Sequence, residues 1–221
     1  MTVFVGLTGG IASGKSTVAR LLEASGAIIV DADRVAHDLL SPGTPVHRAV
    51  VERFGEDILS TDSTDGTIDR RALAEAVFGA TAAHGARREL EAIVHPAVWQ
   101  EVVSRVDAAG KAEEADGRLR VVVVDAPLIV ETLPDRGRSI GLQALIVVAA
   151  RVEDQMERSL GLGRSAEEVE ARMAAQAPSA QKLAAADYVV DNRGTLDDLE
   201  RSVDVLWKDL VERLGAASQT R

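Results

Sequence analysis

The sequence contains no cysteine, which excludes disulfide bonds, thiolate metal ligands and thiol nucleophiles. This absence is compatible with a reducing compartment, where structural disulfides are rare. Aromatic residues are also scarce, at 3%, so the core has to be built mainly from aliphatic side chains. Such a core suits buried parallel strands covered by alanine-rich helices.

The chain also lacks a long hydrophobic run and an excess of positive charge. No stretch approaches the roughly 18 apolar residues that spanning a bilayer requires. The apolar start has no basic flank and is too short for a secretory signal. The formal net charge is −10, whereas a nucleic-acid surface needs clustered Lys and Arg. We therefore predict a cytoplasmic protein that binds small molecules and contacts neither nucleic acid nor membrane.

Five short runs rich in β-branched residues predict buried strands, and the segments between them show helical periodicity. Strands that alternate with helices predict an α/β fold with a doubly wound parallel sheet of five strands. The length of 221 residues suits a single domain. The predicted strands are Val3–Leu7, Ala27–Val30, Arg120–Val124, Ala144–Val148 and Tyr188–Val190, and the predicted helices include Lys15–Ala24, Asp69–Phe78, Pro96–Val106 and Leu196–Leu214.

Two segments are longer than this simple alternation needs. A crossover between parallel strands takes about a dozen residues, so the long gap before the third strand predicts a helical insertion at about residues 34–106 that would bind the acceptor. Residues 153–176 carry Arg158 and Arg164 on either side of a glycine-containing turn. This composition is typical of a small mobile lid.

Residues Gly9–Ser16 match the phosphate-binding loop pattern, in which a Gly and four free positions precede Gly-Lys-Ser. The motif follows a predicted strand and opens a predicted helix, so backbone N–H groups and the helix N-terminus would converge on a phosphate. Lys15 would reach the β- and γ-phosphates, and the Ser16 hydroxyl would join a Mg²⁺ shell. The residues expected to bind ATP are Gly10, Ile11, Ala12, Ser13, Gly14, Lys15, Ser16 and Thr17.

The motif alone does not separate kinases from GTPases or motor ATPases. The guanine-reading Asn-Lys-x-Asp pattern is absent, because the only Asn is Asn192, which argues against a regulatory GTPase. Asp125 ends the third predicted strand, where a carboxylate could approach Mg²⁺ through water. A role as a loop or capping residue is the alternative for Asp125.

Asp31 and Asp33 follow the second predicted strand. Ligands of open α/β sheets bind at the carboxyl ends of the strands. Asp33 would therefore face the phosphate loop and accept the proton of an acceptor hydroxyl, while Asp31 could orient that hydroxyl or support the metal through water. The alternative is that one of the two caps a helix beginning near Arg34.

Taken together, these motifs resemble the dephospho-coenzyme A kinase family, and the resemblance runs through nearly the whole chain. Single blocks are weak, but their order and spacing are specific. The matching blocks are Gly6–Ser16, Asp31–Ala36, Pro42–Pro45, Phe54–Gly55, Asp69–Leu73, Val77–Phe78, His95–Pro96, Pro127–Glu131, Gln155, Arg158, Arg172, Ala175–Gln176, Asp187 and Asp191–Gly194.

The resemblance implies transfer of the γ-phosphoryl group of ATP to the ribose 3′-hydroxyl of dephospho-coenzyme A. Asp33 falls on the family's proposed base, Arg70 is a candidate for binding acceptor phosphate, and His95 falls on the acceptor-side motif. Asn192 would lie in the adenine-proximal loop. The alternatives are a surface role for Arg70, a position flanking a helix start for His95, and a turn role for Asn192.

Two positions depart from the family pattern. Leu162 stands where a second lid arginine is usual, so that Arg164, two residues on, either replaces it or leaves the lid weaker. Ala12 stands where a loop glycine is common, which we expect to be tolerated if its φ is negative. Two other functions stay open: another P-loop small-molecule kinase, such as a nucleoside monophosphate kinase, or a non-catalytic ATP-binding regulatory protein.

Overall fold

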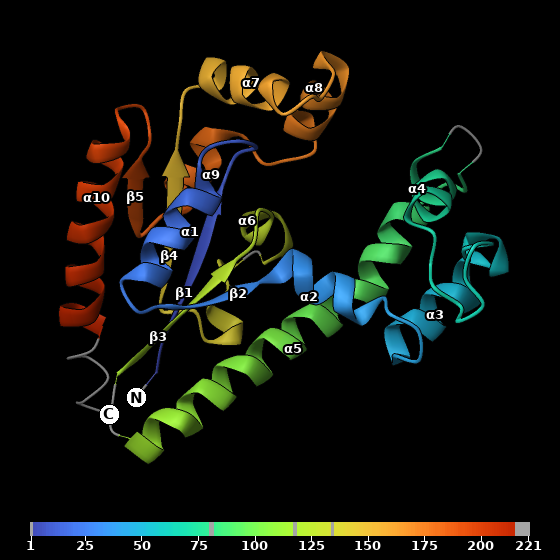
Figure 1. The fold of residues 1–221 in the computed structure, drawn as a ribbon, viewed down its shortest axis with the longest axis horizontal. Helices are drawn as coiled ribbons and strands as arrows, with labels where there is room; N and C mark the ends of the chain where they lie inside the picture. The colour runs from blue at the N-terminus through green and yellow to red at the C-terminus, as the bar shows by residue number, and fades with distance from the viewer. Residues whose placement is uncertain (1, 80–81, 117–118, 134, 215–221) are drawn as a thin grey trace. The chain divides into compact units, whose positions relative to one another are not determined.

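The computed structural model describes residues 2–79, 82–116, 119–133 and 135–214 (Figure 1). All five predicted strands are present and form one parallel sheet in the order β2-β3-β1-β4-β5. This arrangement places β1, and the phosphate loop that follows it, in the middle of the sheet. The strands are β1 (Thr2–Gly9), β2 (Ile28–Asp31), β3 (Arg120–Asp125), β4 (Ala144–Ala149) and β5 (Tyr188–Asp191).

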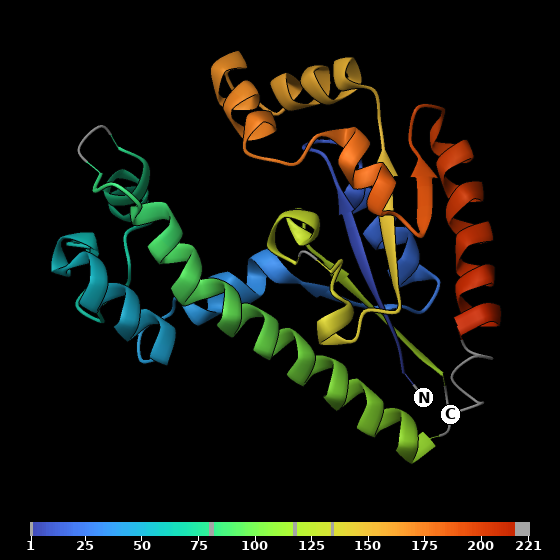
Figure 2. The same cartoon turned by 180° about the vertical axis from the view of Figure 1, so that it is seen from behind.

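Helices cover both faces of this sheet, as a doubly wound fold predicts. Alternate side chains of β1, such as Val5 and Leu7, pack with buried residues of α1 (Lys15–Ala24) and α10 (Leu196–Asp209). On the opposite face lie the short α6 (Ile129–Thr132) and α9 (Ser179–Ala185), and Figure 2 shows α9 in front of the sheet with α1 behind it. The period-two alternation of the central strand thus fills two aliphatic layers.

The long helix α5 (Ala86–Asp116) corrects one expectation from the sequence. We predicted that a helix begins at Pro96, but this proline lies inside α5. Proline removes one backbone hydrogen bond from a helix interior. The helical spacing of buried side chains nevertheless continues past it, at Val94, Val98 and Val102. Burial of this face outweighs the local signal for a helix start.

The chain divides into two compact units, one made of residues 1–31 and 105–221 and the other of residues 32–104. The second unit contains α2 (Ala32–Leu39), α3 (Pro45–Phe54), a 3₁₀ turn and α4, and the first part of α5. The Asp69 side chain caps α4 (Arg70–Phe78) by accepting hydrogen bonds from backbone N–H groups of its first turn.

The remaining helices belong to the first unit. After β4 come α7 (Val152–Gly161) and α8 (Ala166–Ala174), which make up most of the segment predicted to be a lid. A 3₁₀ turn (Arg138–Ile140) precedes β4, and a π-helical turn (Leu210–Leu214) continues α10. Among the described residues, no helix is both long and apolar enough to cross a bilayer.

Helix α10 offers a matched test of the core. Val203 is 1% exposed and packs against the sheet, whereas Val205 on the same helix is 68% exposed. Val203→Ala should lower the free energy of unfolding by about 2 kcal/mol, from lost burial plus a cavity. Val205→Ala should change it by less than about 0.5 kcal/mol. Urea denaturation measures both, and equal losses would contradict the packing described.

Candidate active site

The phosphate loop has the strand–loop–helix geometry that its sequence predicts. Strand β1 ends at Gly9 and α1 begins at Lys15, with Gly14 as its N-cap at φ 94°. The amide of Thr17 donates a hydrogen bond to the Gly14 carbonyl at 2.9 Å. A side chain at position 14 would be both strained and obstructed, because a Cβ there would lie 2.1 Å from Nδ2 of Asn192. Glycine is therefore required at this point.

The backbone at Ala12 does not meet the condition under which we expected a methyl to be tolerated. Its φ is +50°, in the left-handed region, and not negative. An L-residue in this region costs about 1–2 kcal/mol relative to the right-handed region. The loop thus holds a strained residue where the family commonly has glycine, and such strain is typical of ligand-binding loops.

The Lys15 ammonium group forms an ion pair with Asp125 on the neighbouring strand. The parallel register explains this contact, because Asp125 lies opposite Leu7 on β1, at the carboxyl edge of the sheet. Asp125 is the last residue of β3, which does not fit its alternative role as a loop or capping residue. Strand pairing thus brings together a lysine and a carboxylate that are 110 residues apart.

Asp31 stands beside this pair, since the β2–β3 register places it opposite Asp125. Burial raises the pKa of the Asp125 carboxyl above its ordinary value, the charge of Lys15 opposes that shift, and the charge of Asp31 adds to it. Two carboxylates and an ammonium group therefore meet at one edge of the sheet. The exposed Ser16 follows Lys15 at the start of α1.

Asn192 supports the phosphate loop from the far end of the sheet. It directly follows β5, and its Nδ2 donates a hydrogen bond to the carbonyl of Ser13 at 2.7 Å. Its own backbone N–H donates to the carbonyl of Ala149, also at 2.7 Å. This supporting role was missed at the sequence level, because nothing in the local sequence connects residues 192 and 13.

The segment predicted to be a lid contacts the same loop. Arg158 on α7 makes two long hydrogen bonds, to the carbonyl of Ala12 at 3.4 Å and to that of Asn192 at 3.5 Å. Oε1 of Gln176 accepts a hydrogen bond from the amide of Ile11 at 3.1 Å. Arg164 lies in the connection between α7 and α8 and is half-buried. The role of Gln176 was not foreseen, although the residue belongs to a block that resembles the family.

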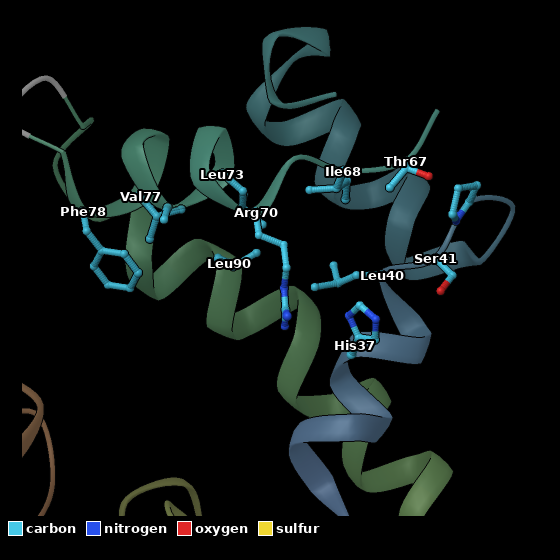
Figure 3. Close-up of a pocket in the computed structure, with 12 residues that line it drawn as sticks. His37, Leu40, Ser41, Thr67, Ile68, Arg70, Leu73, Val77, Phe78 and Leu90 are labelled. Atoms are coloured by element: carbon cyan, nitrogen blue, oxygen red, sulfur yellow. The ribbon is translucent and has the colours of Figure 1, made fainter. Parts of the chain in front are cut away.

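The second unit carries the residues predicted to bind the acceptor. Asp33 lies in the first turn of α2, so this helix begins before Arg34, where a capping Asp was the alternative. Arg70, the first residue of α4, lines a cavity of about 460 Å³ (Figure 3). His95 lies inside α5, half-buried, and not at a helix start. The cavity is lined by His37, Leu40, Ser41, Pro42, Thr67, Ile68, Arg70, Leu73, Ala74, Val77, Phe78 and Leu90.

Within the described residues there is no group of three or more His, Asp or Glu side chains that could hold a metal ion. Mg²⁺ in nucleotide enzymes is usually held by one or two carboxylates together with substrate phosphates and water. The oxygen donors of Ser16, Asp31 and Asp125 are of the type that this ion prefers.

A phosphate loop on the central strand of a parallel sheet, with carboxylates at neighbouring strand ends, defines the class of P-loop kinases that act on small molecules. The family model described as dephospho-CoA kinase matches residues 3–198. The chain belongs to the dephospho-CoA kinase family.

Individual relatives agree with this assignment. A dephospho-CoA kinase of Geobacter metallireducens is 45% identical over 212 residues, which cover 95% of this chain and 97% of that protein. The solved structure of TT1252 from Thermus thermophilus has a TM-score of 0.72 at 32% identity and covers 95% of this chain and 98% of its own. A dephospho-CoA kinase from Campylobacter jejuni has a TM-score of 0.69 at 23% identity, covers 96% and 98%, and supports the fold.

Substitution of Asn192 distinguishes two roles for this residue: support of the phosphate loop through Ser13, and contact with adenine. If Asn192 supports the loop, Asn192→Ala should weaken ATP and GTP binding by a similar factor, about three- to tenfold for one hydrogen bond. Isothermal titration calorimetry with each nucleotide measures this. Asn192→Asp, which loses the donor and adds a charge, should weaken both further. A loss confined to ATP would indicate contact with adenine instead.

Proposed function

We propose that this chain transfers the γ-phosphoryl group of ATP to the ribose 3′-hydroxyl of dephospho-coenzyme A, giving coenzyme A and ADP. The observation that carries the proposal is the phosphate loop whose Lys15 pairs with Asp125 beside Asp31. This arrangement provides one cation for the triphosphate and two carboxylates for its metal ion. Family membership supplies the acceptor class.

Nucleotide binding would depend on the loop from Gly10 to Thr17 and on Lys15. The phosphates would meet loop N–H groups other than those of Ile11, Ser13 and Thr17, which already donate within the protein. Ser16, Asp31 and Asp125 would hold Mg²⁺, which would neutralise phosphate charge as the transfer proceeds. Arg158 already donates a hydrogen bond to the Ala12 carbonyl of the loop, and Arg164 would join it to balance charge on the transferring group. Asn192 would act through the loop that it supports, close to the adenine side.

Asp33 would act as the base. The acceptor oxygen forms its bond to the γ-phosphorus while the bond from that phosphorus to the β–γ bridging oxygen breaks, and the hydroxyl proton passes to the Asp33 carboxylate. Its position on α2, two residues after Asp31, supports this role because α2 begins where β2 ends. ADP leaves with the electrons of the broken bond.

The cavity of the second unit would take the remainder of the acceptor. Asp33 and His37 are four residues apart on α2, so they share one face of the helix about one turn apart. His37 lines the cavity together with mostly apolar side chains, and Arg70 points into the same space in Figure 3. An acceptor with its hydroxyl at Asp33 would thus extend into the cavity and meet Arg70 with a phosphate group. His95 stays a predicted acceptor-side residue.

The function is tested by an ADP-release assay with a panel of acceptors. Dephospho-coenzyme A should stimulate ADP release, whereas AMP and CMP should not. Asp33→Asn should lower kcat with dephospho-coenzyme A by on the order of 10²-fold, because a positioned base is lost, while the Kd for ATP stays the same. Preference for AMP or CMP would indicate a nucleoside monophosphate kinase. Tight ATP binding without stimulation by any acceptor would indicate a regulatory ATP-binding protein.

Arg70 and its neighbour Arg71 offer a matched pair for the acceptor site. Both arginines are exposed, but Arg70 lines the cavity and Arg71 is not one of the lining residues. Arg70→Ala should raise the KM for dephospho-coenzyme A by about tenfold or more, as expected for a lost charged hydrogen bond to phosphate, with the KM for ATP unchanged. Arg71→Ala should leave both constants unchanged. Steady-state kinetics with each substrate varied in turn measures both KM values. Equal changes in the KM for dephospho-coenzyme A in the two variants would contradict the proposal.

A further inference from the structure

Lys182 on α9 is a buried charged residue that the proposed reaction does not use. Its side chain is 2% exposed, which is costly for an ammonium group unless partners replace its hydration. Two partners are present: the carbonyl of Pro127 accepts a hydrogen bond from Nζ at 2.6 Å, and Oε1 of Glu131 lies 2.9 Å from the same atom. The lysine therefore joins α9 to the segment that follows β3.

The Pro127 carbonyl connects this lysine to the two strands of the candidate active site. It accepts a second hydrogen bond, from Oγ1 of Thr8 at 3.0 Å, and Thr8 is fully buried immediately before the phosphate loop. Pro127 itself is two residues beyond Asp125. Lys182 also lines a small hollow of about 30 Å³ together with Gly10 of the loop. Its charge thus lies just beneath the loop, at the ends of β1 and β3.

Glu131 connects the same cluster to the end of the segment predicted to be a lid. Its Oε1, which pairs with Lys182, also accepts a hydrogen bond from the amide of Ala177 at 2.6 Å. The residue before Ala177 is Gln176, whose Oε1 accepts from the Ile11 amide. The ion pair of Glu131 with the buried Lys182 therefore fixes the backbone next to Gln176, the glutamine that holds the loop.

The other end of that segment reaches the loop in a similar way. Gln155 on α7 is buried and donates a hydrogen bond from Nε2 to the carbonyl of Ala150 at 3.1 Å. Its Oε1 lies so close to Gly10 that a Cβ there would be 2.3 Å away. Two glutamines at the two ends of the segment thus meet neighbouring residues of the loop, Gly10 and Ile11. The part between them includes the exposed Leu162.

We propose that Lys182 and Glu131 are positioning residues, which hold Gln176 against the Ile11 amide and thereby keep the phosphate loop in its nucleotide-binding shape. Neither residue needs to touch ATP or the acceptor. The inference rests on the proposed function only in so far as the loop binds ATP. ATP affinity, and not only stability, should then depend on residues beneath the loop.

The test measures the Kd for ATP with Mg²⁺ by isothermal titration calorimetry on the full chain, at a temperature where circular dichroism shows each variant to be folded. Lys182→Met, Glu131→Gln and Gln176→Ala should each raise the Kd about three- to tenfold. Because all three act through one contact, Lys182→Met combined with Gln176→Ala should cost no more than the larger single effect. The controls Lys208→Met and Gln181→Ala, at exposed positions, should leave the Kd unchanged.

A structural role alone would lower the melting temperature of Lys182→Met while the folded protein kept its Kd within about twofold. That result, or losses that multiply in the double variant, would overturn the inference. If Lys182→Met does not fold, the test relies on Glu131→Gln and Gln176→Ala, because both residues are partly exposed. An unchanged Kd for ATP in both of these variants also overturns the inference. Failure of the unaltered protein to bind ATP would instead contradict the proposed function.

Discussion

The ion pair between Lys15 and Asp125 is the interaction on which the rest of the site depends. It joins the start of α1 to the end of β3 and holds the lysine at the carboxyl edge of the sheet. Burial raises the pKa of Asp125, while the lysine favours its ionised form. An incoming triphosphate would attract the same ammonium group, and a metal ion would attract the carboxylate released from it. The ion pair thus holds Lys15 and Asp125 in place, with their charges balanced by one another, before ligands bind.

The phosphate loop is held from several directions, because a glycine-rich backbone does not determine its own shape. Asn192 binds the Ser13 carbonyl from the end of β5, and Gln176 binds the Ile11 amide from beyond α8. The positive φ of Ala12 has to be maintained against its intrinsic cost, which such surrounding contacts make possible. The loop is therefore a property of the whole first unit rather than of eight consecutive residues.

Much of the fold was predictable because its signals are local. Each buried strand is a short β-branched run, and the Gly-Lys-Ser motif marks the point where strand turns into helix. Prediction failed where a local signal competed with packing. Pro96 indicated a helix start, but the apolar face of α5 runs through it. At Ala12 the sequence left the sign of φ open, and the structure has a positive one.

The sequence by itself determined the strands, the phosphate loop and the family pattern, since these depend on residue types at short spacings. Only the tertiary structure decided which residues surround the loop. Asp125 is 110 residues from Lys15, and Asn192 is 179 residues from Ser13. These pairs meet because the strand order β2-β3-β1-β4-β5 places β3 beside β1 and sets the register of the strand ends. Strand order depends on how the helices and strands pack together, and no short stretch of sequence encodes it.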